Sequence, residues 1–350
     1  MKRYLYGLDP ADNAGSARRL REMGYDAVVL SAGGDAFRAA REAGLETWLC
    51  FGAHAIGDFS QRDYGARDAR GADAPWFGSA CPNAGAVSDR NMDAAFAFAE
   101  KTDGLTGIFV DGARFASFAS EEGTSAFFGC FCERCMRKMA ALGFDAAATR
   151  SGVVQLMDYL NGGDGDIPAI RDAMENWFGF RAACVGEYME GFCARAHAAG
   201  LKAGAFVFAP SLWYFVGQRP TALSSLDVVS PMLYRAYPHE TGTACLSHEW
   251  AAFHALLSNA QRSADEVASL LFDISFMTDD PMSGFSPAHV GFESKAARAQ
   301  LPKSVSLAPI VQTEDERLDE TIERVMESGA DACGEFMYAQ KFPSGEESDV

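Results

Sequence analysis

The stretch that decides the fold is Leu105-Thr106-Gly107-Ile108-Phe109-Val110-Asp111-Gly112-Ala113-Arg114-Phe115. Residues 107–110 form a short apolar run typical of a buried strand, and an aspartate and an arginine follow soon after it. In α/β proteins the chemistry lies at the carboxyl ends of parallel strands, where the outgoing loops bring side chains together. We therefore expect Asp111 and Arg114 to lie at a functional site.

Seven further short apolar runs share this pattern, and most are followed by an amphipathic helical pattern. They are residues 4–8, 27–31, 47–51, 203–208, 228–234, 305–311 and 333–338. Continuous apolar runs are typical of parallel strands that are buried on both faces. Eight such strands predict an α/β fold, a single (β/α)8 TIM barrel over residues 1–343. An open doubly wound sheet is the alternative, but no G-x-G-x-x-G turn follows an early strand.

The alternation of strands and helices is interrupted between residues 116 and 200. A connection of this length without structure of its own would be unusual in a compact domain. Helical patterns at 124–142, 153–160 and 170–199 indicate a long helical insertion after the fourth strand. Residues 344–350 form a polar tail.

The composition excludes several classes of partner. The chain has 350 residues and a formal net charge of -18, with 48% hydrophobic and 22% charged residues. Nucleic acids bind to basic surfaces, and no basic run occurs. No apolar window of about 18 residues and no signal-peptide pattern is found. These features predict a cytoplasmic protein without a nucleic acid or membrane partner, and they leave a homo-oligomer open.

Three of the nine cysteines form the pattern C-x-C-x-x-C at Cys130, Cys132 and Cys135, and Cys81 lies upstream. Zn²⁺ is bound by four thiolates at about 2.3 Å, and ligands two and three residues apart can converge on one ion. A complete set of four cysteines leaves no open position, so the predicted zinc would be structural. Free thiols or a redox group are the alternative. No organic cofactor is predicted.

This cysteine arrangement resembles the zinc site of the glycoside hydrolase family 42 β-galactosidases, which lies in the loop after strand 4 of a barrel. Residues 107–115 are similar to the G-hydrophobic-D-x-x-R-[FY] strand of uncharacterised barrel proteins described as glycoside-hydrolase-like, which also carry segments similar to 230–234. Family 42 has an Asn-Glu acid at strand 4 and a Glu nucleophile at strand 7. This chain has Asp111 and Gln312-Thr313-Glu314 there. The resemblance therefore implies the broader class of carbohydrate-active barrels.

Two carboxyl groups are the predicted catalytic pair. Glycoside hydrolysis needs one carboxyl group that protonates the leaving oxygen and another that attacks or activates water. Asp111 is the predicted nucleophile or base, because Arg114 would keep it ionised; a pair that only caps the strand end is the alternative. Glu335 is the predicted acid, since a carboxyl group in an apolar strand must face a cavity or a partner.

The other strand ends supply polar and aromatic side chains suited to sugar hydroxyls and ring faces. The substrate-binding candidates are Asp9, His54, Arg114, Trp213, Tyr234, Arg235 and Gln312. We predict a glycoside hydrolase that acts on a carbohydrate or glycoconjugate at the barrel mouth. One alternative is a lyase or isomerase of a sugar acid, with Asp111 as the base and Arg114 or Arg235 holding the substrate carboxylate. The other is a barrel that binds a carbohydrate without converting it.

Overall fold

The structure, a computed structural model, describes residues 2–31, 33–119, 124–235, 245–258, 260–275 and 285–337. Nine strands in these ranges form one sheet, and every adjacent pair is parallel. In chain order they are β1 Lys2–Tyr6, β2 Ala27–Leu30, β3 Glu46–Gly52, β4 Gly107–Asp111, β5 Lys202–Val207, β6 Val228–Pro231, β7 Ser306–Leu307, β8 Ile310–Gln312 and β9 Ala332–Phe336. Their order in the sheet is β7-β6-β5-β4-β3-β2-β1-β9-β8.

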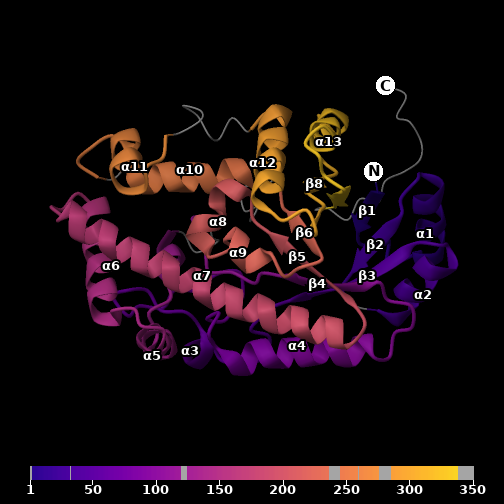
Figure 1. The fold of residues 1–350 in the computed structure, drawn as a ribbon, viewed down its shortest axis with the longest axis horizontal. Coiled ribbons are helices and arrows are strands. Elements are labelled where there is room, and N and C mark those ends of the chain that lie inside the picture. The colour runs from indigo at the N-terminus through magenta and orange to yellow at the C-terminus, as the bar shows by residue number, and fades with distance from the viewer. Residues whose placement is uncertain are drawn as a thin grey trace.

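Helices surround the curled sheet (Figure 1). They are α1 Asn13–Glu22, α2 Gly34–Glu42, α3 Gln61–Tyr64, α4 Gly85–Ala99, η1 Thr124–Phe128, α5 Glu133–Ala141, α6 Ala146–Leu160, α7 Ile167–Ala198, α8 Pro210–Val216, α9 Pro220–Leu223, α10 Leu246–Leu257, α11 Ala264–Phe272, α12 Pro287–Gln300 and α13 Leu318–Met326. The long helix α7 lies beside α4, to which the ion pair of Arg195 with Asp93 joins it at 2.5 Å. None of the helices in the described ranges is long and apolar enough to cross a membrane.

The two edge strands of the curled sheet, β7 and β8, come from neighbouring parts of the chain. Each predicted apolar run overlaps a strand, and the run 305–311 overlaps two: β7 pairs with β6, whereas β8 pairs with β9. Between them, Ala308 N donates to Val229 O at 2.9 Å, and Pro309 O accepts from Gly334 N at 2.7 Å. Proline has no N–H for a ladder, which explains the interruption. The architecture is that of an α/β barrel.

The segment between β4 and β5 is helical, as the sequence predicts. The expected helix at 124–142 is divided into η1 and α5, and α6 and α7 begin earlier than the apolar pattern indicates. Asp145 and Asp166 explain both starts, because their side chains accept from Ala148 N and Ala169 N as N-caps. That residues 116–200 form an insertion stays a prediction. Residue 338 of the eighth apolar run and the tail 344–350 lie outside the described residues.

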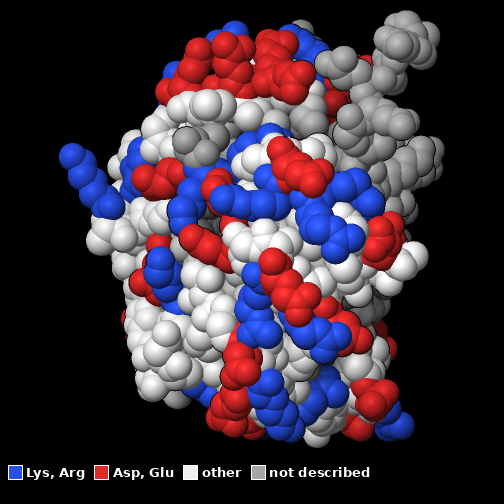
Figure 2. Space-filling model, turned by 90° about the vertical axis from the view of Figure 1, so that its right-hand side faces the viewer, with Lys and Arg blue, Asp and Glu red and all other residues white. Residues whose placement is uncertain are grey.

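Charged side chains of both signs are mixed on the face that carries α1 and α2. Figure 2 shows Lys and Arg among Asp and Glu there, without a continuous basic patch. Ion pairs such as Arg19 with Asp12 at 3.4 Å and Arg38 with Asp35 at 2.6 Å account for part of this mixing. This face therefore lacks the basic surface that a polyanion needs.

Aromatic rings fill the inside of the sheet, and glycines make room for them. The rings of Phe109 and Phe206 stack at 4.6 Å, and Tyr4 stacks on Phe109 at 6.3 Å. The Tyr4 hydroxyl is held at Ser230 Oγ, 2.6 Å away, and donates to Ala308 O at 3.0 Å. A Cβ at Gly334 would lie 2.0 Å from the Tyr4 ring. The tyrosine cannot move aside without losing both contacts.

We expect Gly334→Ala to lower the free energy of unfolding by about 1–3 kcal/mol, the usual cost of overpacking a core. Gly34→Ala is the matched control, because a Cβ at Gly34 would meet no atom within 4 Å. Urea denaturation of both variants measures the difference. Equal midpoints for the two variants would contradict this account of the barrel interior.

Candidate functional site

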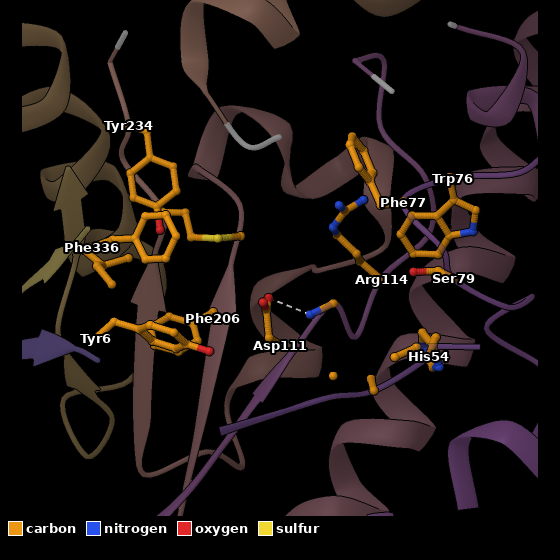
Figure 3. Close-up of a pocket in the computed structure, with 16 residues that line it drawn as sticks. Tyr6, His54, Trp76, Phe77, Ser79, Asp111, Arg114, Phe206, Tyr234 and Phe336 are labelled. Atoms are coloured by element: carbon orange, nitrogen blue, oxygen red, sulfur yellow. Dashed lines mark hydrogen bonds between the residues drawn. The ribbon is translucent and has the colours of Figure 1, made fainter. Parts of the chain in front are cut away.

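A pocket of about 520 Å³ lies where the carboxyl ends of several strands meet. Its polar lining residues include His54, Ser79, Asp111 and Arg114, and its aromatic ones are Tyr6, Trp76, Phe77, Phe206, Tyr234 and Phe336. Figure 3 shows Tyr234 and Phe336 on one side, and Arg114, Trp76 and Phe77 on the other, with Asp111 between them. Four of the predicted site residues, Asp111, Arg114, His54 and Tyr234, are therefore brought together here.

Asp111 is the last residue of β4, and it places a carboxyl group on the floor of the pocket. Its Oδ1 accepts a hydrogen bond from Gly112 N at 2.7 Å. Desolvation by the surrounding protein raises the pKa of Asp111, and the charge of Arg114 and the Gly112 hydrogen bond offset this only in part. The charge of Arg114 thus acts in the expected direction, by lowering the pKa of Asp111, but desolvation outweighs it and the net shift is upward. A raised pKa suits a group that both donates and accepts a proton.

Arg114 is almost fully buried, with 5% of its surface exposed. Its guanidinium lies over the rings of Phe208 at 4.2 Å and Trp76 at 4.9 Å, and Nη1 donates to Phe115 O at 3.0 Å. Burial lowers the pKa of Arg114 to about 10, against the opposing influence of Glu249 and Asp111. The side chain therefore remains a cation at neutral pH.

His54 is a neutral lining residue. Its ring is buried, lies 5.2 Å from the ring of Tyr188, and holds Nδ1 2.9 Å from Ser88 Oγ. Burial lowers the pKa of His54 to about 3, and the charge of Arg114 acts in the same direction. The imidazole can exchange hydrogen bonds with a ligand but carries no charge near neutral pH.

Glu335 does not line the pocket, which corrects its predicted role as the acid. The next residue, Phe336, points into the pocket, and neighbouring side chains of a strand point to opposite faces. The Glu335 carboxylate accepts from Arg3 and from the Tyr25 hydroxyl, each at 2.7 Å. Its buried charge is therefore paired on the other side of the sheet, away from Asp111.

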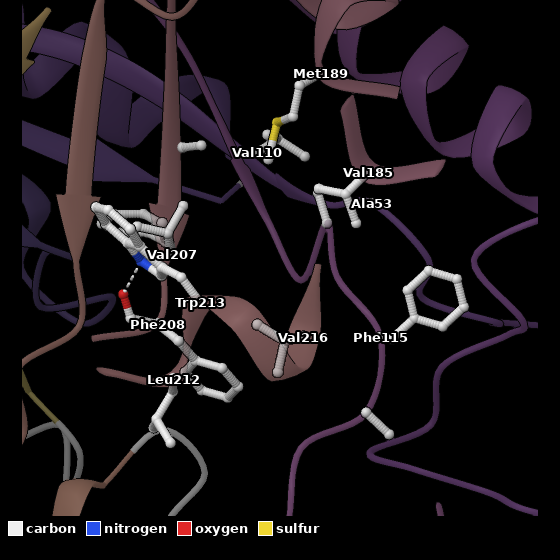
Figure 4. Packing of buried hydrophobic residues seen from close by; sticks show 14 of the residues in the cluster. Ala53, Val110, Phe115, Val185, Met189, Val207, Phe208, Leu212, Trp213 and Val216 are labelled. Carbon is white, nitrogen blue, oxygen red and sulfur yellow. Dashed lines mark hydrogen bonds between the residues drawn. The ribbon is translucent and has the colours of Figure 1, made fainter. Parts of the chain in front are cut away.

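Two further predicted site residues, Trp213 and Arg235, lie outside the pocket. Trp213 is a packing residue of α8 whose indole Nε1 donates to Phe208 O at 2.6 Å, as Figure 4 shows. Arg235 forms an ion pair with Asp315 and also donates to Phe285 O at 3.2 Å. Neither side chain is among the residues that line the pocket.

The last two candidates lie near the pocket without lining it. Asp9 borders a second cavity of about 610 Å³, which shares Tyr6 and Phe336 with the first, and it accepts from Ala11 N at 2.9 Å. Gln312 ends β8 and is buried, and neither Nε2 nor Oε1 of its amide has a hydrogen-bond partner in the described part of the chain. Neither residue lines the pocket that contains Asp111.

Most of the aromatic residues that line the pocket were not predicted from the sequence. Side chains two residues apart on a strand point to the same face of the sheet. This alternation could have indicated Tyr6, Phe206 and Phe336 as residues that face the inside of the barrel. Trp76 and Phe77 gave no such signal, because they come from the irregular segment between α3 and α4.

The four cysteines of the predicted metal site come together in the structure. Cys81, Cys130, Cys132 and Cys135 are buried, and their sulfur atoms all lie within 4.8 Å of one another. Asn83 Nδ2 also donates to Cys135 Sγ at 3.2 Å. Four convergent thiols with a donor to one sulfur could hold a metal ion.

Comparison with known proteins gave no family assignment. No protein-family model and no curated protein matches the chain. Among solved structures, the glycoside hydrolase domain of PgaB (BpsB) from Bordetella bronchiseptica matches with 13% identity over 95% of this chain and 92% of that one, at a TM-score of 0.49. The 3-keto-D-glucoside 4-epimerase YcjR from E. coli matches with 11% identity over 98% and 94%, at 0.38. A chitinase from Chromobacterium violaceum matches with 12% identity over 88% and 68%, at 0.34.

The lowered pKa of His54 predicts a loss of stability in acid. Because the folded-state pKa of about 3 lies below the unfolded value of 6.5, the unfolded chain binds the proton first as the pH falls. Between about pH 6.5 and about pH 5, we expect wild type to lose about 2 kcal/mol that His54→Gln keeps. Urea denaturation across this pH range measures it, with His254→Gln as the control. Parallel profiles for wild type and His54→Gln would refute the assignment.

Proposed function

We propose that the protein is an enzyme that cleaves a glycosidic bond of a carbohydrate or glycoconjugate, with Asp111 as its acid–base group. One observation carries this proposal: an enclosed carboxyl group with a raised pKa on the floor of an aromatic-walled pocket at the strand ends. Aromatic side chains offer ring faces for sugars, and a protonated carboxyl group is what a leaving glycosidic oxygen needs.

In the proposed reaction, the Asp111 carboxylic acid gives its proton to the glycosidic oxygen as the bond from that oxygen to the anomeric carbon breaks. Water then forms a new bond to the anomeric carbon and passes a proton to the Asp111 carboxylate, which restores the acid. Many glycosidases divide these steps between two carboxyl groups. Among the described residues that line the pocket, Asp111 supplies the carboxyl group, so we assign both steps to it.

Asp111→Asn tests this role. An amide can neither give a proton to the leaving oxygen nor take one from water, so we expect release from aryl glycosides to fall by about 10²- to 10⁴-fold. Asp103→Asn is the matched control, because Asp103 is exposed before the amino end of the same strand. A panel of phenyl glycosides at several pH values gives the measurement, because a phenolate, unlike a nitrophenolate, is a poor leaving group without a proton. Undiminished release by Asp111→Asn, or no release from any glycoside by wild type, would remove the proposal.

A second candidate is a lyase or isomerase reaction, in which Asp111 removes a proton next to a carbonyl group. It is favoured by the single carboxyl group among the described lining residues, since proton abstraction needs only one base. Product analysis in ¹⁸O-labelled water separates the two. Hydrolysis places the label in the product, whereas a lyase or isomerase leaves the carbon–oxygen bonds of the product unlabelled.

We also infer that the four cysteines bind a structural zinc ion. The convergent, buried sulfur atoms support this, as does the hydrogen bond that Asn83 Nδ2 donates to Cys135 Sγ at 3.2 Å. Four thiolates fill the tetrahedral shell of zinc and leave no position for water. The ion would join the loop of Cys81 to the start of α5 rather than take part in catalysis.

Cys132→Ser should abolish zinc binding and destabilise the protein, because structural zinc contributes directly to the free energy of folding. We expect about one zinc per chain in wild type, the stoichiometry of one four-cysteine site. Cys193→Ser removes a buried thiol of α7 outside the cluster and should keep the metal. Elemental analysis and thermal denaturation of the three proteins decide. Far less than one zinc per chain in wild type, with unchanged stability in Cys132→Ser, would exclude the site.

We interpret β7 and β8 as a single strand that is interrupted at Ala308 and Pro309, which makes the sheet a (β/α)8 barrel. The support is that the two halves are two residues apart and that Met232, next to β6, also pairs with Ile310 of β8. This closure would bring Asp111 and Ile310 into the lining of one pocket.

A further inference from the structure

The arginines that are buried or partly buried in the described residues differ in how their donors are used. The buried Arg181 donates to three backbone carbonyls, and the partly buried Arg235 is paired with Asp315. Arg114 is buried like Arg181, yet its side chain donates one hydrogen bond to the described residues, from Nη1 to Phe115 O. It forms no ion pair with any residue that the structure describes. Most of its five N–H donors are therefore unused.

The carboxylates that influence Arg114 are occupied by other donors. Glu249 accepts from Ser117 Oγ at 2.8 Å and from Ala119 N at 3.0 Å, and Asp111 accepts from Gly112 N. They act on the guanidinium through their charge and not through direct hydrogen bonds. A buried cation without a direct partner is costly, so its retention at a pocket points to a ligand that completes it.

The surroundings of Arg114 hold its guanidinium in one orientation. The rings of Trp76 and Phe208 lie against it, and cation–π contacts of this kind fix the guanidinium plane. Figure 3 shows the group in the space between Asp111 and the side chains of Trp76 and Phe77. Its unused N–H groups are thus within the pocket that also contains the proposed acid.

We propose that Arg114 binds a carboxylate of the substrate, so that the enzyme acts on an acidic sugar such as a uronoside. The inference rests on the proposed function and names its substrate class. One guanidinium offers two parallel N–H donors, the arrangement that a carboxylate accepts. Arg114 is the one charged base among the described lining residues, since His54 is neutral, and a single cation next to Asp111 suits a monoanion better than a phosphate dianion.

The test compares a sugar acid with its uncharged ester. Isothermal titration calorimetry of glucuronate and galacturonate, each against its methyl ester, measures recognition of the charge separately from turnover. We expect wild type to bind one of the two acids about 10- to 100-fold more tightly than its ester, the range for a charge-assisted bidentate contact. Asp111→Asn should keep this preference, because it retains Arg114 and places no charge beside it.

Arg114→Gln should bind the acid and the ester with nearly equal affinity. Arg317→Gln, which removes an exposed arginine paired with Glu320, is the matched control and should keep the preference for the acid. Thermal denaturation checks that each variant is folded. If Arg114→Gln does not fold, the comparison of acid and ester on wild type decides on its own.

Equal binding of acid and ester by wild type, or no binding of either acid at millimolar concentrations, overturns the role of Arg114. Cleavage of neutral aryl glycosides as fast as aryl uronosides also overturns it but leaves the proposed hydrolysis standing. Acid-selective binding without cleavage of any aryl uronoside has the opposite meaning: it supports the carboxylate site and removes the proposed hydrolysis.

Discussion

The interaction on which much of the structure depends is that of the buried guanidinium of Arg181 with backbone carbonyls. Arg181 lies on α7 and donates to the carbonyls of Phe127, Gly129 and Phe215. Phe127 lies in η1, Gly129 follows η1 and precedes the cysteine cluster, and Phe215 lies near the end of α8. The last carbonyls of a helix and those of the chain that follows it have no partner within the helix and need other donors, and one arginine supplies three. The segment after β4, the cysteines and α8 therefore share one anchor.

A comparison of Arg181 with Arg114 distinguishes a structural arginine from one that can bind a ligand. Arg181 and Arg114 are both buried among aromatic rings, at 4.1 Å from the ring of Trp177 and 4.2 Å from that of Phe208. Backbone carbonyls accept three hydrogen bonds from Nη1 and Nη2 of Arg181, whereas its buried Nε has no partner among the described residues. Arg114 has a single backbone acceptor and opens into the pocket. The two arginines differ in how many guanidinium N–H groups form hydrogen bonds with the described residues. Only the three-dimensional structure reveals this number.

The sequence was sufficient to predict the location of a site residue that directly follows a strand or that belongs to a set of closely spaced metal ligands. Asp111 and the cysteine pattern are of this kind. It failed for Glu335, because an apolar run does not say which of two adjacent residues faces inward, and a shift of one residue exchanges the faces. It also failed for Trp213, which belongs to a short helix, α8, instead of a strand end. Trp76 comes from a loop whose course depends on distant contacts.

The charges of Asp111 and Arg114 connect substrate binding to proton transfer. In the free protein, the cation of Arg114 lowers the pKa of Asp111 and so works against its protonation, although desolvation prevails. A substrate carboxylate on Arg114 would neutralise that cation and place a further negative charge nearby. Both changes favour the protonated form of Asp111. An acidic substrate would therefore help to create the acid that cleaves it, whereas a neutral sugar in the same pocket would leave Asp111 closer to ionisation.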